Sequence, residues 1–325
     1  MRFDLLHLWY LGEPGRPALV GASRRLIEGR LPLAPAHELL SAPPHIGRLS
    51  MRKMMMTVCM TLAVAAAPVL AADWPAAGQP GSLEWALAGS WRAAGDVSRD
   101  AVRHPAEELK FMGLQPGMSV VEIYPGGGYF TSILGPVLKQ DGGKLTVVGG
   151  AEEAGSKYKD KFIGHPETYG PLTYSSLNAK SGPIAPANSA DLVVTFRNVH
   201  NWMDEGFADK AFADFFKALK PGGLLGVEEH RGKAEGTQDP KAASGYVQEA
   251  YVKALAEKAG FQFVKSSELL ANPKDTKDYP FGVWTLPPTL LSSADGKTVD
   301  PNFDHSKYVA IGEADNMLLV FRKPK

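Results

Sequence analysis

Side chains that can take up or release protons gather in two short runs of the sequence. The first run, FRNVHNW, contains Asn198, His200 and Trp202. The second run, EEHR, brings two carboxylates, an imidazole and a guanidinium: Glu228, Glu229, His230 and Arg231. Imidazole has an ordinary pKa of about 6.5, so a histidine can accept a proton from a nucleophilic oxygen or nitrogen at neutral pH. The two runs predict a catalytic site in which His200 and His230 act as bases.

The neighbours of the two histidines have candidate roles as well. Asn198 can hold the amino end of a ligand, Trp202 can stack on a ring or form an apolar wall, and Arg231 can bind a substrate. Structural roles are the alternative. His200 can be an ordinary loop histidine, and the EEHR run can be a solvated strand end whose charges pair with one another. The sequence leaves both interpretations open.

Two histidines and two glutamates can also bind a metal ion, because imidazole and carboxylate groups suit zinc or iron. The chain has neither an HExxH motif nor a two-histidine-carboxylate spacing. The sequence therefore predicts no metal site, and the acid–base interpretation is preferred.

The run VVEIYPGGGYFT, residues 120–131, is a third feature that can do chemistry. An apolar strand leads through Gly126, Gly127 and Gly128 into a helix, which exposes backbone amides at the helix N-terminus and favours an anion or a polar cofactor. A dinucleotide fingerprint would have glycine where Thr131 stands, and a P-loop would end in Gly-Lys-Ser/Thr. The alternative is that the three glycines only make a tight turn.

These runs need a scaffold that brings them together, and the hydrophobic pattern predicts one. The expected strands cover residues 119–124, 144–148, 190–198, 224–228, 261–267 and 316–323. The expected helices cover residues 105–114, 129–138, 209–219 and 244–259. Alternating strands and helices form a parallel sheet covered on both faces, with ligands outside the carboxyl ends of the strands. The glycine turn and both polar runs follow strands, so we expect them at one edge of the sheet. Residues 155–188 give no clear pattern.

From about residue 98 onward, the sequence resembles the class I S-adenosylmethionine-dependent methyltransferases. Their first motif runs acid-x-Gly-x-Gly-x-Gly, and Glu122, Gly126 and Gly128 match the acid and the last two glycines. Tyr124 stands where the family has its first glycine, and Thr131 is a common companion. The segments YPGGGYFT, FRNVHNW and LKPGGLLGVEEHR look like those of a small group of predicted, often exported, methyltransferase-like proteins.

This resemblance implies a Rossmann-like α/β fold, with a seven-stranded, mostly parallel sheet, an antiparallel last strand and helices on both faces. It implies S-adenosylmethionine as cofactor, with Glu122, Tyr124 and the three glycines beside its methionine part. Glu122 would orient the turn or bind the amino group through water, and Asn198 would hold the same end. Glu152 is the acid nearest to where the family binds the ribose, and Leu177 and Asn178 would border the adenine.

These features together predict methyl transfer from S-adenosylmethionine to a small-molecule acceptor. The alternative is an exported, non-enzymatic binding module on a degenerate methyltransferase fold. Lys plus Arg and Asp plus Glu number 35 each, so the charge balance gives no reason to expect a nucleic acid or an anionic membrane as partner. An irregular insert at about residues 268–308 can cap the site. Its Tyr279, Phe281 and Trp284 either face a substrate or form the insert's own small core.

Three segments precede the methyltransferase-like domain of residues 98–325. Residues 1–50 are expected to be a wrongly assigned or disordered extension, and residues 73–97 a lead-in segment. Residues 51–72 have the basic start, the short apolar core and the small residues near Ala71 that are typical of a cleaved signal peptide. Cleavage there would give a periplasmic or secreted protein with no stable membrane anchor.

N-terminal sequencing of the native protein is therefore expected to begin close to residue 72, since the cleavage pattern ends at Ala71. The mature chain would then contain no thiol, because the only cysteine, Cys59, lies within the signal. A peptide recovered from residues 1–50 of the native protein would contradict this expectation.

Overall fold

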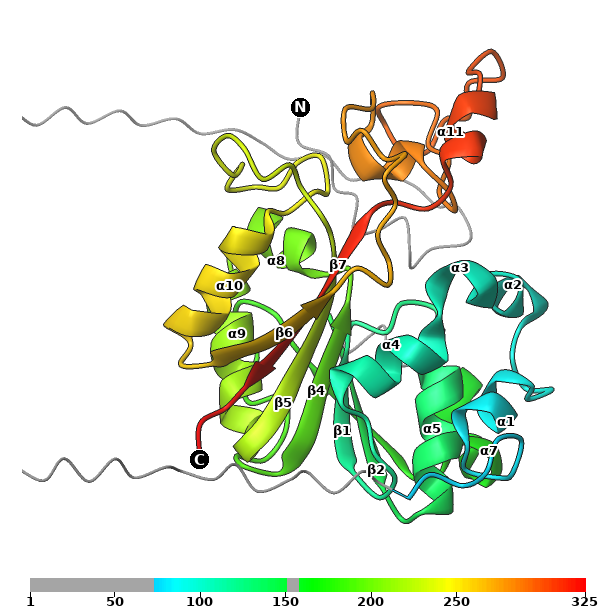
Figure 1. Ribbon diagram of the computed structural model, residues 1–325, viewed down its shortest axis with the longest axis vertical. Coiled ribbons are helices and arrows are strands. Elements are labelled where there is room, and N and C mark those ends of the chain that lie inside the picture. Colours follow the sequence, from blue (N-terminus) through cyan, green and yellow to red (C-terminus); the bar gives the residue numbers. More distant parts are fainter. Residues whose placement is uncertain (1–72, 151–157) are drawn as a thin grey trace, which may run out of the picture. The chain divides into compact units, whose positions relative to one another are not determined.

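The computed structural model describes residues 73–150 and 158–325, which form a seven-stranded sheet with helices on both faces (Figure 1). The strands are β1 (Ser119–Ile123), β2 (Lys144–Gly149), β3 (Leu172–Ser176), β4 (Ala190–Phe196), β5 (Leu219–His230), β6 (Gln262–Ser267) and β7 (Asn316–Arg322). Their order is β3-β2-β1-β4-β5-β7-β6. The strands from β3 to β5 run parallel, and β7 runs antiparallel between β5 and β6. The predicted Rossmann-like fold is confirmed.

The register of the parallel strands places the candidate residues at one edge of the sheet. Ile123 at the end of β1 pairs with Val148 of β2 and with Thr195 of β4. Phe196 at the end of β4 pairs with Glu228 of β5. The glycine turn after β1, the segment after β4 and the end of β5 therefore lie at the same carboxyl edge.

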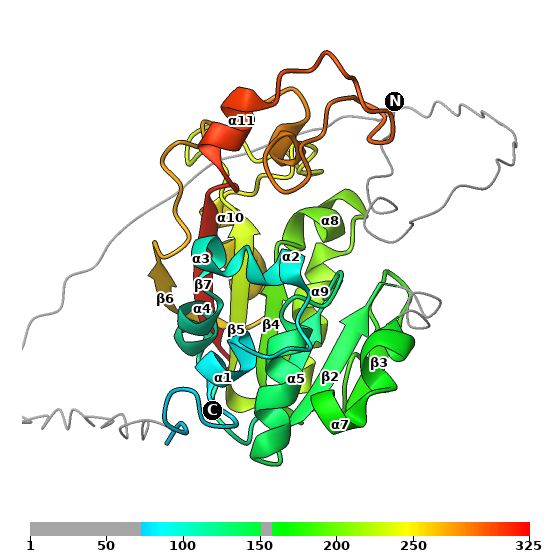
Figure 2. The ribbon, with the colours of Figure 1, turned by 90° about the vertical axis from the view of Figure 1, so that its right-hand side faces the viewer.

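Helices pack on both faces of the sheet and bury an apolar layer on each. One face carries α1 (Leu83–Leu87), α2 (Ala94–Val97), α3 (Asp100–Arg103), α4 (Pro105–Met112), α5 (Thr131–Gln140) and α7 (Pro166–Tyr169). Figure 2 shows α4 and α5 in front of the strands. Figure 1 shows α8 (Val199–Asp204), α9 (Ala208–Ala218) and α10 (Glu249–Lys258) on the opposite face. Phe212 and Phe215 of α9 recur at helical spacing and are fully buried, which fixes that helix on the sheet.

The structure corrects the expected elements in three places. Residues 155–188 contain η2 (Lys159–Ile163), α7 and the edge strand β3, whose sequence LTYSS has only Leu172 buried and so lacks a long apolar run. β5 starts earlier than predicted, because Leu219 already pairs with Ala190 of β4. The helix predicted at residues 244–259 begins only at Glu249.

The irregular insert between β6 and β7 has a small core of its own. Val283, Leu286, Tyr308 and Ala314 of the insert are buried together with Tyr246, which precedes α10, and Tyr279 and Trp284 pack against this cluster. The insert contains η3 (Gly282–Thr285) and α11 (Ser306–Ile311), and Figure 1 shows it beyond the end of the sheet at which β7 starts. The insert therefore adjoins the carboxyl edge.

Predictions for residues 1–72, including the signal peptide, and for Glu152 fall outside the described parts of the chain. Among the helices of those described parts, none is both long and apolar enough to cross a membrane.

Candidate functional site

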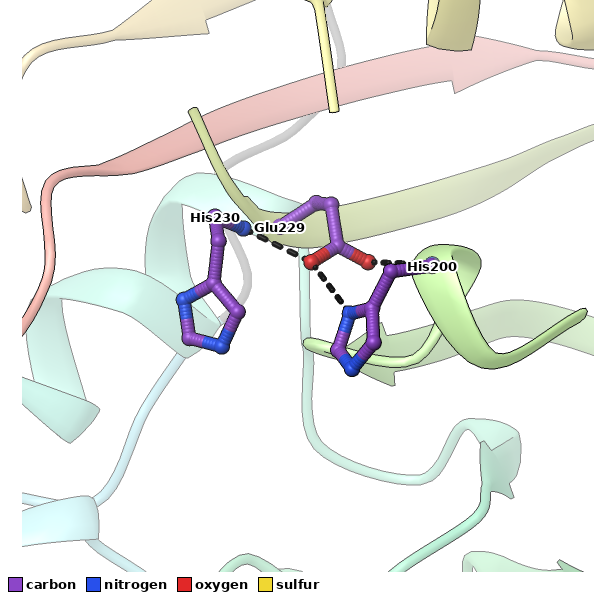
Figure 3. A group of neighbouring side chains, drawn as sticks. All are labelled: His200, Glu229 and His230. Carbon is purple, nitrogen blue, oxygen red and sulfur yellow. Dashed lines mark hydrogen bonds and ion pairs between the residues drawn. The ribbon is translucent and has the colours of Figure 1, made fainter. Parts of the chain in front are cut away.

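His200 and His230 come together around one buried carboxylate, that of Glu229 (Figure 3). His200 is the second residue of α8, which begins shortly after β4, whereas Glu229 and His230 end β5. The His200 ring Nδ1 lies 2.9 Å from Glu229 Oε1, and the backbone N–H of His200 donates to Oε2 at 3.2 Å. The backbone N–H of His230 donates to Oε1 at 2.8 Å. Burial alone would raise the pKa of Glu229, but the His200 ring and these hydrogen bonds hold it below its ordinary value.

The His230 ring has its own orienting partner on β7. Its Nδ1 lies 2.8 Å from Asn316 Oδ1, while Asn316 Nδ2 donates to Glu228 Oε1 at 2.8 Å. Because the carboxylate of Glu228 accepts the hydrogen bond from Asn316 Nδ2, the amide oxygen of Asn316 must face the His230 ring. An oxygen only accepts, so the proton of the ring is assigned to Nδ1. Burial lowers the pKa of His230 to about 3, so this ring is neutral at physiological pH.

Glu228 belongs to a buried charge cluster on the other face of β5. It lies 3.7 Å from Arg197 Nε, and Arg197 Nη1 donates to Glu313 at 3.3 Å. Arg103 also pairs with Glu313, at 3.1 Å. Burial raises the pKa of Glu228 to about 7 and that of the neighbouring Glu108 well above its ordinary value. The alternative that the EEHR run is a solvated strand end is wrong, because Glu228 and Glu229 are 4% and 0% exposed.

The glycine turn combines one packing glycine with two that face open space. Gly126 and Gly128 have φ angles of 56° and 85°, which favour glycine. A Cβ built on Gly128 would lie well under 3.0 Å from two ring carbons of Phe162. Within the described parts of the chain, a Cβ on Gly126 or Gly127 would meet no atom within 4 Å. The turn therefore offers a backbone surface that a ligand can approach closely.

Glu122 lies beneath this turn and connects β1 to α5. It is 1% exposed, and Thr131 Oγ1 donates to its Oε2 at 2.6 Å. The Thr131 hydroxyl also contacts the Tyr158 hydroxyl. Burial raises the pKa of Glu122 to about 7, against the lowering effect of the Thr131 hydrogen bonds. Of the two roles expected for Glu122, these contacts support the one that orients the turn.

Tyr124 adopts a left-handed backbone conformation, with φ of 49°, at the position where the family has a glycine. Its hydroxyl donates to the Leu177 carbonyl oxygen at 2.6 Å, and its ring lies edge-on to Trp202 at 5.7 Å. Trp202 is fully buried and also packs against Phe215, so its ring is part of the core. The Tyr124 side chain thus crosses from the end of β1 towards the segments that follow β2 and β3, where a Cβ on Gly150 would lie 3.1 Å from its hydroxyl.

The described residues fit one end of S-adenosylmethionine better than the other. The open surface at Gly126 and Gly127 suits the methionine part, which needs close contact with backbone. At the end of β2, a Cβ on Gly149 would collide with the Tyr174 hydroxyl, so no acid for the ribose stands there. The adenosine part would have to share its place with the side chain of Tyr124.

Asn198 positions the turn from the end of β4. Its Nδ2 lies 3.2 Å from the carbonyl oxygens of Ile123 and Phe196, and 3.3 Å from that of Tyr124. Asn198 is only 7% exposed, and its amide nitrogen donates these hydrogen bonds within the protein. Asn198 therefore holds β4 against the turn.

Arg231 anchors the insert to the site. Its guanidinium donates to Glu268 at 2.6 Å and to the Asn316 carbonyl oxygen at 3.2 Å. On the other side of the site, Trp284 of the insert lies edge-on to His200 at 5.8 Å. Sequence reasoning missed Asn316, which stands at the start of an apolar strand far from both polar runs and carries no local signal.

The strand order and the antiparallel β7 define the Rossmann-like fold of the class I methyltransferases. No protein-family model matches the sequence, and no curated protein matches it. Among solved structures, a SAM-dependent methyltransferase from Aquifex aeolicus is 20% identical, with 53% of this chain and 86% of that one covered at a TM-score of 0.43. The cyclase SpnF is 17% identical, with 73% and 84% covered at 0.47. A possible exported protein from Bordetella parapertussis is 17% identical, with 70% and 68% covered at 0.42. At these values the likeness extends to the fold alone.

Proposed function

We propose that this protein transfers a methyl group from S-adenosylmethionine to a small-molecule acceptor. The observation that carries the proposal is the open surface over Gly126 and Gly127 at the sheet edge that also holds the His200–Glu229 pair. A backbone surface that a ligand can approach, at the same sheet edge as an oriented imidazole, is what a transfer to a protonated nucleophile requires.

The chain's own residues would position the reactants and remove the acceptor's proton. When bound, S-adenosylmethionine supplies an activated methyl group, so its transfer depends mainly on alignment. Glu122 and Asn198 hold the turn in place through Thr131 and the end of β4. His200 accepts the proton of the acceptor at Nε2, while Glu229 orients the ring and stabilises its positive charge.

A binding module without catalysis is the second candidate. Tyr124 favours it, because its side chain crosses to Leu177 in the region where the resemblance places the nucleoside. Such a module would bind neither S-adenosylmethionine nor its demethylated product and would use the aromatic insert for a partner.

Export is part of the proposal, and the signal-like pattern of residues 51–72 supports it. The sequencing of the mature N-terminus described above tests it independently of methyl transfer.

A pair of matched glycine variants tests methyl-donor binding. Gly126→Ala and Gly142→Ala both put a methyl group into open space on a left-handed backbone, with φ of 56° and 70°. Gly142 lies in the turn before β2, at the opposite edge of the sheet. By calorimetry, the unmodified protein is expected to bind S-adenosylhomocysteine with a Kd of about 50 μM or tighter. Gly142→Ala should leave that Kd unchanged, and Gly126→Ala should raise it at least about tenfold.

Absence of binding at millimolar S-adenosylmethionine and S-adenosylhomocysteine would refute the methyl-transfer proposal and favour the binding module. Equal affinities for the two glycine variants would show that the ligand does not lie on the turn.

A further inference from the structure

The two histidines present unused ring nitrogens to the same space. Each Nδ1 is engaged, by Glu229 Oε1 for His200 and by Asn316 Oδ1 for His230. Neither Nε2 has a hydrogen-bond partner among residues 73–150 and 158–325, and neither is a fully buried unpaired atom. Figure 3 shows both rings projecting on the same side of Glu229, and their centroids are 5.4 Å apart.

This arrangement is the one that metal-binding histidines adopt. A histidine that ligates a metal through one nitrogen nearly always donates its other N–H to a carboxylate, a carbonyl or an amide oxygen. His200 and His230 both have such a partner in place, and one candidate ligand atom from each of His200, Glu229 and His230 lies within 4.8 Å of the others. We propose that the Nε2 atoms of His200 and His230 bind a divalent transition-metal ion, with zinc as the first candidate.

Glu229 orients the ligands in this site. Its Oε1 already receives the His200 ring and the His230 backbone N–H, and its Oε2 receives the His200 backbone N–H. A fully buried carboxylate with three hydrogen bonds is held in place, and its negative charge offsets part of the ion's charge. Asn316 does the same for His230 without adding charge.

Two protein ligands leave at least two coordination positions of a tetrahedral ion for water or a substrate. Trp284 of the insert lies 5.8 Å from His200, and Tyr246, which precedes α10, lies 6.4 Å from His230. Aromatic rings therefore flank both ligands of the proposed site. A motif search misses it because its two histidines come from α8 and β5 and not from one helix.

The inference does not depend on methyl transfer, since metal binding is measured without any methyl donor. If both proposals hold, an ion held by His200 and His230 would supply Lewis-acid polarisation of the acceptor, whose proton would pass to solvent, and His200 would serve as a ligand in place of its role as base. The donor-binding test on Gly126 and the metal test can fail separately.

The test titrates zinc into the full-length protein after removal of metal with a chelator. Calorimetry is expected to show one site per chain with a Kd of about 10 μM or tighter. His200→Gln and His230→Gln should each weaken that site at least about a hundredfold. His165→Gln is the control, because the side chain of His165 is 55% exposed and its one ion pair among the described residues is with the exposed Glu167.

Thermal unfolding shows whether the variants are folded. Each variant should unfold cooperatively without zinc, and zinc should raise the melting temperature of the unmodified protein and of His165→Gln only. Asn316→Ala should weaken zinc binding about 10- to 100-fold through loss of ring orientation. No heat and no melting shift at millimolar zinc would overturn the proposal, and so would full binding in the double variant His200→Gln/His230→Gln.

Discussion

Alanine at position 128 is expected to lower the free energy of unfolding by about 3 kcal/mol or more, the largest stability effect at the glycine turn. Its Cβ would lie well under 3.0 Å from two ring carbons of Phe162. Phe162 is 1% exposed and packs against Tyr158 and Tyr169 at 4.6 and 4.9 Å, so the ring has little room to move. The left-handed φ of 85° adds strain of about 1 kcal/mol.

Urea unfolding of four variants, Gly126→Ala, Gly128→Ala, Phe162→Leu and Phe162→Leu/Gly128→Ala, separates the clash from the strain. Gly126→Ala shares the backbone conformation but meets no atom, so it should destabilise by only about 1 kcal/mol. In a Phe162→Leu background, the effect of Gly128→Ala should fall towards that of Gly126→Ala, because the ring carbons are gone. Equal destabilisation by Gly128→Ala and Gly126→Ala in the unmodified background would contradict the packing role of Gly128.

Glu122→Gln is expected to gain stability relative to the unmodified protein as the pH rises. From pH 4 to pH 8, the difference in unfolding free energy between the two proteins should shift in favour of the variant by about 3 kcal/mol. Burial raises the pKa of Glu122 from 4.5 to about 7. Below pH 4.5, the carboxyl group is protonated in both the folded and the unfolded chain, so it has no pH-dependent effect. Between pH 4.5 and about 7, the unfolded chain releases the proton and the folded chain retains it, so stability falls as pH rises. Glutamine has no proton to release and avoids this loss.

The measurement is the difference in unfolding free energy between the two proteins at several pH values from 4 to 8. Other buried carboxyl groups with raised pKa values, such as Glu228, are present in both proteins and largely cancel. A difference that stays constant across this range would show that Glu122 ionises normally in the folded state.

The sequence predicted the parts of the fold that rest on long apolar runs. β1 and β4 are buried on both faces, so each reads as a continuous hydrophobic segment that needs no partner to be recognised. The edge strand β3 has solvent on one side and a polar composition, and only pairing with β2 makes it a strand.

The candidate site was likewise predicted only in part from the sequence. His200, Glu229 and His230 stand next to strand ends, so the rule that ligands bind at the carboxyl edge located them. The sequence could not predict that these three side chains lie close together, because a local motif does not reveal contacts between α8 and β5. Asn316 was missed for a related reason: its side chain acts on His230 through the antiparallel pairing of β5 with β7, which brings the two residues opposite each other.

The bond from Tyr124 to Leu177 has a consequence for how a ligand would bind. Together with the contacts of Asn198 to the turn, it ties the segments after β1, β3 and β4 to one another. Ordering loops on binding usually subtracts from affinity, about 0.5–1.5 kcal/mol for each side chain that becomes fixed. Here the hydrogen bonds of Tyr124 and Asn198 hold these segments, so less ordering is needed when a ligand binds. Calorimetry is therefore expected to show only a small loss of conformational entropy on binding.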